Sequence, residues 1–193
     1  MSEKTDSKKK LIIEKATEVF AAKGYKAVTM KDIVEACGIS RGGLYLYYAS
    51  TEDIFADVVA TQETEEDSDK AMERILEADA SELFLWFIKE QKKEILRKKN
   101  SLLIAKYEYA FMCKEQGDSK DAKSTFETAV TVLDNILKRG NDSGEFKCED
   151  TLATARSMMY AIEGMKVSAA TFGISEKKVD SELMFMMNRF IGA

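Results

Sequence analysis

Residues 32–48 read "DIVEACGISRGGLYLYY", and this stretch decides the fold because it predicts two short helices joined by a tight turn. Gly38 breaks the chain after the first helix, and Ser40 can cap the second through its hydroxyl. Two short helices at this spacing predict a helix-turn-helix, the motif whose second helix enters the major groove of DNA. The same spacing also fits an ordinary helical hairpin whose glycines only make a turn.

The start of the second helix carries two adjacent glycines, Gly42 and Gly43, each of which costs about 1 kcal/mol in a helix interior relative to alanine. A recognition helix meets DNA with its N-terminal residues, and glycines there let the backbone approach phosphates or base edges closely. The free N–H groups of that turn also favour an anion. Arg41 adds a charge, and Tyr45 and Tyr47 add hydroxyls that can donate to phosphate oxygens. We therefore predict that these five residues contact DNA.

The residues upstream complete a small helical unit. Apolar spacing predicts a first helix over residues 7–23, with Gly24 as its left-handed C-terminal cap. The second helix is expected to begin at Thr29, because Asp32 follows at the spacing of a capping box, and to end near Cys37. Together with the helix after Ser40, these elements predict a three-helix unit.

The composition predicts an all-α protein. The 193 residues include no proline, 45% are hydrophobic, and helix-forming residues dominate. Residues 1–50 hold nine of the 29 basic residues and six of the 34 acidic ones, a balance of +3, whereas the remainder has a balance of −8. A basic N-terminal piece joined to an acidic body indicates an anionic partner at one end of the chain.

Three stretches in this order resemble the DNA-binding domain of the TetR family of bacterial transcriptional regulators: "ATEVFAAKGY" at 16–25, "TMKDI" at 29–33 and "ACGISRGGLY" at 36–45. The resemblance covers residues 9–58. It implies that phosphates are contacted by Thr29, Ser40, Tyr45 and Tyr47, and that bases and nearby phosphates are approached by Arg41, Gly42 and Gly43. It also implies that Leu44 and Tyr48 are packing residues.

Three positions depart from the family pattern. Gly43 stands where threonine or another side chain is common, so one base contact is expected to be missing. Tyr47 stands where histidine is common, and Thr51 stands where lysine usually starts the fourth helix. These departures imply that affinity depends more on Arg41 and on the lysines at 8–10, although such a basic run is also typical of a solvated helix start.

The resemblance implies a domain order. Residues 1–50 would form the DNA-binding domain, a fourth helix from about residue 51 would link the two domains, and residues 51–193 would form a larger helical domain for effector binding and dimerisation. Hydrophobic periodicity predicts further helices, with breaks at Gly117, at residues 140–146 and at Gly173, over residues 68–78, 81–99, 101–116, 119–139, 149–172 and 175–191.

Aromatic and methionine residues gather in this acidic body. Each is more typical of core packing, but together they could line a pocket for an apolar or amphipathic effector. The candidate pocket residues are Trp86, Phe87, Tyr107, Phe111, Met112, Phe126 and Met159.

Two apolar stripes near the C-terminus suggest a four-helix dimer interface, although packing inside one subunit explains them equally well. The candidate interface residues are Leu152, Ala155, Met159, Ile162, Ala169, Val179, Leu183, Met187 and Phe190. A two-fold dimer would present two recognition helices to an inverted repeat.

Other features exclude several function classes. The chain has no histidine, no phosphate-binding glycine loop and no nucleophile elbow, so we expect no catalytic residue, metal or cofactor. The absence of a signal peptide and of an apolar span predicts a cytoplasmic protein with no membrane partner. The resemblance to the TetR family therefore predicts a ligand-responsive regulator, a repressor, that binds inverted-repeat operator DNA as a homodimer and is released by a small effector.

Two alternatives stay open at this point. One is a redox-sensing regulator on the same scaffold, with Cys113 or Cys148 as its switch. The other is a helical enzyme or interaction protein whose helix-turn-helix is incidental.

Overall fold

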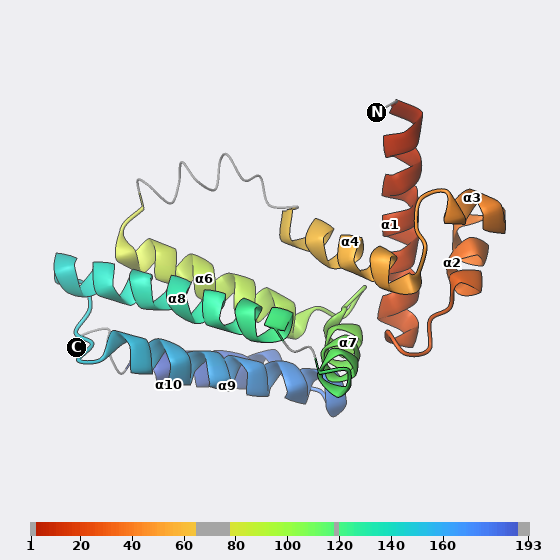
Figure 1. Ribbon diagram of the computed structural model, residues 1–193. Coiled ribbons are helices and arrows are strands. Elements are labelled where there is room, and N and C mark those ends of the chain that lie inside the picture. The colour runs from red at the N-terminus through yellow and green to blue at the C-terminus, as the bar shows by residue number, and fades with distance from the viewer. Residues whose placement is uncertain (1–2, 65–77, 118–119, 189–193) are drawn as a thin grey trace. The chain divides into compact units, whose positions relative to one another are not determined.

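The computed structural model describes residues 3–64, 78–117 and 120–188, and every regular element in them is a helix (Figure 1). The all-α prediction is therefore confirmed. The chain folds into two compact units: unit 1 comprises residues 1–71 and 98–116, and unit 2 comprises residues 72–97 and 117–193. No described helix combines the length with the apolar character that crossing a lipid bilayer demands.

The described part of unit 1 contains five helices: α1 (Glu3–Lys23), α2 (Met30–Cys37), α3 (Arg41–Tyr45), α4 (Thr51–Thr64) and α7 (Leu103–Glu115). Their ends follow the predicted caps. Thr29 and Asp32 form a complete capping box at the start of α2, and Gly38 ends that helix in the left-handed conformation with a φ of 64°. The Ser40 hydroxyl caps α3 by accepting a hydrogen bond from Gly43 N. A helix-turn-helix thus lies at the predicted residues.

Unit 1 extends beyond residue 50, because α4 and α7 share its core. Ile54, Phe55 and Val58 of α4 are buried beside Ile12, Ala16 and Phe20 of α1. Leu102 and Ala105 add the start of α7 to the same cluster. Since α6 and α8 belong to unit 2, α7 belongs by packing to a different unit from its neighbours in the sequence.

Unit 2 contains α6 (Ala80–Leu96), α8 (Lys120–Ser143), α9 (Thr151–Thr171) and α10 (Glu176–Met187), which lie side by side in Figure 1. Their apolar faces meet in one core that includes Phe84, Leu133, Met159 and Leu183. The predicted helices in this part of the chain are confirmed, with ends that differ by a few residues. The predicted helix over residues 68–78 lies almost wholly outside the described residues.

The predicted break at residues 140–146 is wrong at its start, because α8 continues through Gly140 to Ser143. A Cβ atom at Gly140 would overlap the ring of Phe146, so this glycine provides room for a packed aromatic side chain instead of ending the helix. The chain turns at Gly144, whose φ is 79°.

Candidate nucleic-acid interface

The outer surface of α3 carries a positive charge that no described residue neutralises. Arg41 and Tyr45 are both exposed, and the guanidinium carbon of Arg41 lies 5.6 Å from the centroid of the Tyr45 ring. The two residues are one helical turn apart, and this cation–π contact keeps the guanidinium group close to the tyrosine side chain. Arg41 forms no ion pair within the described part of the chain, so its charge is available to an external anion.

The two glycines of α3 differ in their surroundings. A Cβ atom at Gly43 would lie 3.1 Å from the Ser40 Oγ, the same oxygen that accepts a hydrogen bond from Gly43 N at 3.1 Å. The fold therefore explains why residue 43 is a glycine, because a side chain there would crowd the N-cap oxygen of Ser40. Gly42 has no such reason: no atom of the described residues lies within 4 Å of the place where its Cβ would stand, and its φ is not in the left-handed region.

The inner surface of α3 is fixed to the core of unit 1. Leu44 and Tyr48 are buried, as expected of packing residues. The Tyr48 hydroxyl donates to Asp57 Oδ2 at 2.8 Å, and Lys9 Nζ lies 3.1 Å from the same oxygen. Burial alone would raise the pKa of Asp57, but the tyrosine and the lysine outweigh it and hold that pKa below its ordinary value. Asp57 on α4 thus ties down α1 and the chain that leaves α3.

The lysines at 8–10 are divided by this network. Lys9 is held within unit 1 by its ion pair with Asp57 and lies 5.3 Å from the centroid of the Tyr48 ring. Lys8 and Lys10 are exposed. The two exposed lysines are consequently the members of this run that are free to face an anion.

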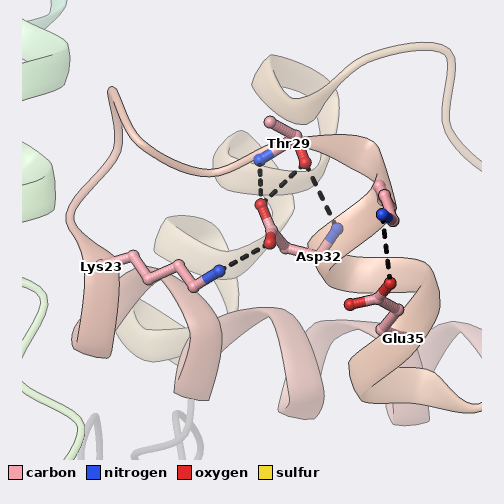
Figure 2. Close-up of polar contacts among 5 residues, drawn as sticks. Lys23, Thr29, Asp32 and Glu35 are labelled. Atoms are coloured by element: carbon pink, nitrogen blue, oxygen red, sulfur yellow. Dashed lines mark hydrogen bonds and ion pairs between the residues drawn. The ribbon is translucent and has the colours of Figure 1, made fainter.

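Thr29 uses its hydroxyl proton within the protein, as Figure 2 shows. The hydroxyl donates to Asp32 Oδ2 at 2.7 Å, while Asp32 Oδ1 lies 2.6 Å from Lys23 Nζ. The hydrogen bonds from Lys23 and Thr29 hold the pKa of Asp32 far below its ordinary value, so the carboxylate is charged at neutral pH. A phosphate at Thr29 would have to compete with Asp32 for that proton.

Ser40, Tyr47 and Thr51 complete the predicted contacts and departures. Ser40 is exposed, and because its oxygen accepts from Gly43 N, its own proton stays available for donation. Tyr47 is half-buried and packs against the core of unit 1. Thr51, the first residue of α4, is also half-buried. Arg41, Gly42 and Tyr45 are therefore joined on the exposed surface by Ser40, whereas Tyr47 is only partly accessible.

A shallow hollow lies between α1 and α2 and is lined by Glu18, Val19, Ala22, Lys23, Asp32 and Glu35. Its carboxylates form ion pairs with lysines of the same unit: Lys15 with Glu18, Lys23 with Asp32, and Lys31 with Glu35. Three carboxylates already paired in this way make the hollow a poor site for an anionic polymer.

α7 supports the helix-turn-helix from behind. Glu108 accepts a hydrogen bond from Lys26 N at 2.9 Å, and a Cβ atom at Gly24 would lie 2.6 Å from the same carboxylate oxygen. The Tyr109 ring packs edge-on against Tyr25, with ring centroids 4.9 Å apart, and its hydroxyl donates to Glu52 at 3.1 Å. These contacts fix the α1–α2 turn and the start of α4. Sequence reasoning missed them because they join residues far apart in the chain.

The seven predicted pocket residues are divided between the two units. Tyr107, Phe111 and Met112 lie on α7, where Met112 packs against the core of unit 1 and Phe111 is 61% exposed. Phe87 and Met159 are buried in the core of unit 2, and Phe126 packs against that core. Trp86 is 39% exposed. A pocket within unit 2 alone would therefore draw on Trp86, Phe87, Phe126 and Met159.

The predicted interface residues are similarly divided. Ala155, Met159, Ile162, Val179 and Leu183 are buried in the core of unit 2, so one subunit already covers them. Ala169 and Met187 pack partly against that core, and Phe190 lies outside the described residues. Leu152 is exposed. The other exposed large apolar residues on the same two helices or their ends are Tyr160, Val167, Phe172, Met184 and Phe185.

The cysteines lie in different surroundings. Cys148 is buried in unit 2, and its thiol lies 3.2 Å from the Thr154 hydroxyl. Cys113 is half-buried on α7 of unit 1, and Cys37, also half-buried, has its pKa raised by burial. A buried, hydrogen-bonded thiol is a poor target for oxidants, so the Cys148 position gives a redox switch little support.

Comparisons with known proteins cover most of the chain. A family model described as bacterial regulatory proteins of the tetR family matches residues 12–58, and one described as a tetracyclin repressor-like C-terminal domain matches residues 83–180. An uncharacterized HTH-type transcriptional regulator of Bacillus subtilis, YfiR, is 29% identical over 185 residues, which span 92% of this chain and 86% of the relative.

Two further similarities span nearly the same length. The fatty acid metabolism regulator protein of Bacillus subtilis is 26% identical over 175 residues, which cover 88% of this chain and 85% of that protein. The crystal structure of a TetR transcription regulator from Haloarcula marismortui has a TM-score of 0.76 at 18% identity, with 94% of this chain and 95% of the other covered.

Proposed function

Because the chain belongs to the TetR family of bacterial transcriptional regulators, we propose that it represses transcription by binding an inverted-repeat operator as a homodimer, and that a small effector releases it. Members of this family regulate transcription and are not enzymes. The proposed site of action is the cytoplasm, where bacterial DNA lies. Unit 1 would read the operator, and unit 2 would bind the effector and the second subunit.

The observation that carries this proposal is Gly42. A glycine inside a helix lowers stability by roughly 0.5–1 kcal/mol relative to alanine, yet the surroundings of Gly42 would accept a side chain. Its neighbours Arg41 and Tyr45 are exposed and face no described acidic partner. A bare backbone beside an uncompensated arginine suits the close approach of DNA, since a phosphate or a base edge can then reach the helix directly.

We expect Gly42→Ala to separate stability from binding. The free energy of unfolding of unit 1 should rise by about 0.5–1 kcal/mol, because alanine restricts the unfolded chain and favours the helix. Operator affinity should fall, and it should fall further in Gly42→Val, whose larger side chain holds the backbone away from DNA. Thermal unfolding and fluorescence anisotropy with a selected operator duplex measure the two effects.

Ala22→Val is the matched control, because it places the same valine side chain at an exposed position of α1. That variant should bind the operator like the parent protein. If Gly42→Ala and Gly42→Val also bind like the parent, α3 does not approach DNA at this position and the proposed mode of binding is wrong.

We assign an apolar or amphipathic effector to unit 2. Its core combines Phe87, Met159 and half-buried Phe126, and methionine suits an adaptable wall. Charge is present as well: buried Lys166 lies 2.8 Å from Glu94 and 3.0 Å from Glu163. The similarity to a regulator named for fatty acid metabolism agrees with this class of ligand. Trp86, the single tryptophan, is a fluorescent reporter for such binding.

The homodimer proposal rests on the exposed apolar residues of α9 and α10. Tyr160 and Val167 are 62% and 45% exposed on α9, and Met184 and Phe185 are 54% and 67% exposed on α10. Gly164 lies between the first two and is exposed. Within the described part of the chain no atom lies within 4 Å of a Cβ added there, so another helix can come close. Two copies of this surface would form a four-helix interface.

A further inference from the structure

Leu46 is the most exposed large apolar residue in the described part of unit 1, with 84% of its surface accessible. It follows α3 as the C-cap and keeps a helical backbone, with a φ of −69° and a ψ of −21°. Leu44 and Tyr48, two residues before and after it, are buried in the core. Leu46 is therefore exposed to solvent, although Leu44 and Tyr48 on either side of it pack into the core of unit 1.

Leu46 lies on the same side of the helix as Gly42. Its N–H donates to the Gly42 carbonyl at 3.2 Å, so the two residues are one turn apart. Side chains of a helix lean toward the preceding turn, and here that turn carries Gly42, which has no side chain. The leucine therefore borders the bare backbone through which the proposed function brings α3 to DNA.

The chemistry of the surrounding surface narrows what Leu46 can contact. The sequence from Ala36 to Thr51 contains no acidic residue, and Arg41 and Tyr45 lie beside Leu46 on the exposed side of α3. One apolar side chain between cationic and polar neighbours is too small a patch for a stable protein interface. In the major groove, however, the apolar group that a base edge offers is the 5-methyl of thymine.

We propose that Leu46 is a specificity-determining residue that contacts the 5-methyl group of one thymine in each operator half-site. This inference rests on the proposed function, because it requires α3 to lie in the major groove. Gly42 and Leu46 are about 6 Å apart along the helix axis, since each helical residue advances about 1.5 Å. At about 3.4 Å per base pair, the thymine lies within about two base pairs of the position that approaches Gly42.

The test uses the full-length protein and an operator that it selects from random duplex DNA. Each thymine of the selected half-site is replaced in turn by deoxyuridine, which lacks the 5-methyl group alone. At one thymine the parent protein should lose about threefold to fivefold in affinity, the contribution of one methyl group. Leu46→Ala should bind the unmodified operator about fivefold to thirtyfold less tightly and should be insensitive to deoxyuridine at that same position.

Two variants serve as controls. Leu46→Met keeps an apolar side chain of similar volume and should retain the sensitivity to deoxyuridine. Leu85→Ala removes a leucine that is 45% exposed on α6 of unit 2, and it should bind every duplex like the parent. Because Leu46 is exposed, its replacement should leave the helical circular dichroism of the protein unchanged.

Several results would overturn the inference. A loss in Leu46→Ala that is equal on every duplex would mean that the leucine touches the sugar–phosphate backbone. Unchanged DNA binding with a changed molecular mass by light scattering would mean that it contacts protein. If the parent selects an operator but no deoxyuridine lowers its affinity, this inference alone is wrong. If the parent selects no duplex at all, the proposed function fails as well.

Discussion

The caps that start helices in unit 1 and the contacts that join helices in unit 2 connect residues at different distances along the chain. In unit 1, the contacts that start α2 and α3 join residues three apart, as in Thr29 with Asp32 and Ser40 with Gly43. In unit 2, Glu145 bonds to Ser81 across 64 residues, and Arg156 pairs with Glu127 across 29. Short-range contacts leave a pattern in the sequence, whereas long-range contacts are set by how helices pack.

The difference extends to what each unit presents to its surroundings. The exposed surface of α3 is short and carries Arg41, Gly42, Tyr45 and Leu46. α9 carries apolar residues on opposite sides, so that Met159 is buried while the adjacent Tyr160 is 62% exposed. α3 exposes side chains on one side only, and such a short surface suits contact with DNA. A helix that is apolar on two sides, as α9 is, can pack against its own core on one side and against a second subunit on the other.

The largest expected effect is a loss of operator affinity when the proposed dimer interface in unit 2 is disrupted. Val167→Asp and Phe185→Asp place charges on the exposed apolar surface of unit 2, so we expect the protein to become monomeric. Operator affinity should then fall by at least about 100-fold, because one recognition helix loses the effective concentration that the second provides. Light scattering measures the mass, and anisotropy measures the affinity.

Val132→Asp is the matched control for this experiment, because Val132 is 41% exposed on α8, away from α9 and α10 in the sequence. It should remain dimeric. A dimer that persists in both interface variants would place the contact between subunits on another surface and weaken the contrast between the two units.

A smaller effect should come from Gly140→Ala in unit 2. The added methyl group would overlap the Phe146 ring, and overpacking of this kind costs about 1–3 kcal/mol in the free energy of unfolding. Phe146→Leu in the same chain should relieve part of the loss, so the double variant should be more stable than the sum of the two single changes implies. Calorimetry should show the change in the unfolding of unit 2, with the stability of unit 1 unaffected.

We expect the opposite change in stability from Gly42→Ala in unit 1, because the added methyl group would meet no atom of the residues that the structure describes. Two glycine-to-alanine changes in helices should therefore move stability in opposite directions. If Gly140→Ala is as stable as the parent, the ring of Phe146 does not depend on this space, and the packing reason given for Gly140 is wrong.

The smallest expected effect is a shift in acid stability. The Glu145 carboxylate accepts hydrogen bonds from the Ser143 hydroxyl and from Ser81, and these hold its pKa at about 2. Because this pKa is lowered on folding, the stabilisation is complete above the ordinary value of 4.5 and is lost as the pH falls toward 2. Glu145→Gln should lower the urea midpoint at pH 7, and the difference from the parent should vanish near pH 2.

Glu149→Gln is the control, because Glu149 lies in the same loop between α8 and α9 and is exposed. It should unfold at the same urea concentration as the parent at both pH values. A constant difference between Glu145→Gln and the parent at all pH values would mean that the side chain acts by shape and not by charge.

The same contrast between short-range and long-range contacts decides which features of the structure the sequence predicts. The caps at Thr29, Ser40 and Gly38 were predictable because each depends on residues within one turn, and the buried positions of Leu44 and Tyr48 follow from the family motif. Which apolar stripe of α9 faces its own core was not predictable, because both sides satisfy the same periodicity. The role of Gly140 was also hidden, since the ring that needs its space follows six residues later, beyond the end of the helix.

α7 has a consequence for anyone who builds hybrid regulators. A single junction after residue 50 would transfer the helix-turn-helix without Glu108 and Tyr109, which contact the α1–α2 turn and the start of α4. A transplant that keeps its original supports must carry two separate stretches, α1 to α4 and α7, and the recipient must accept both. The helix-turn-helix, which we propose to contact DNA, therefore cannot be exchanged as one continuous segment, and its exchange requires new junctions on either side of residues 98–116.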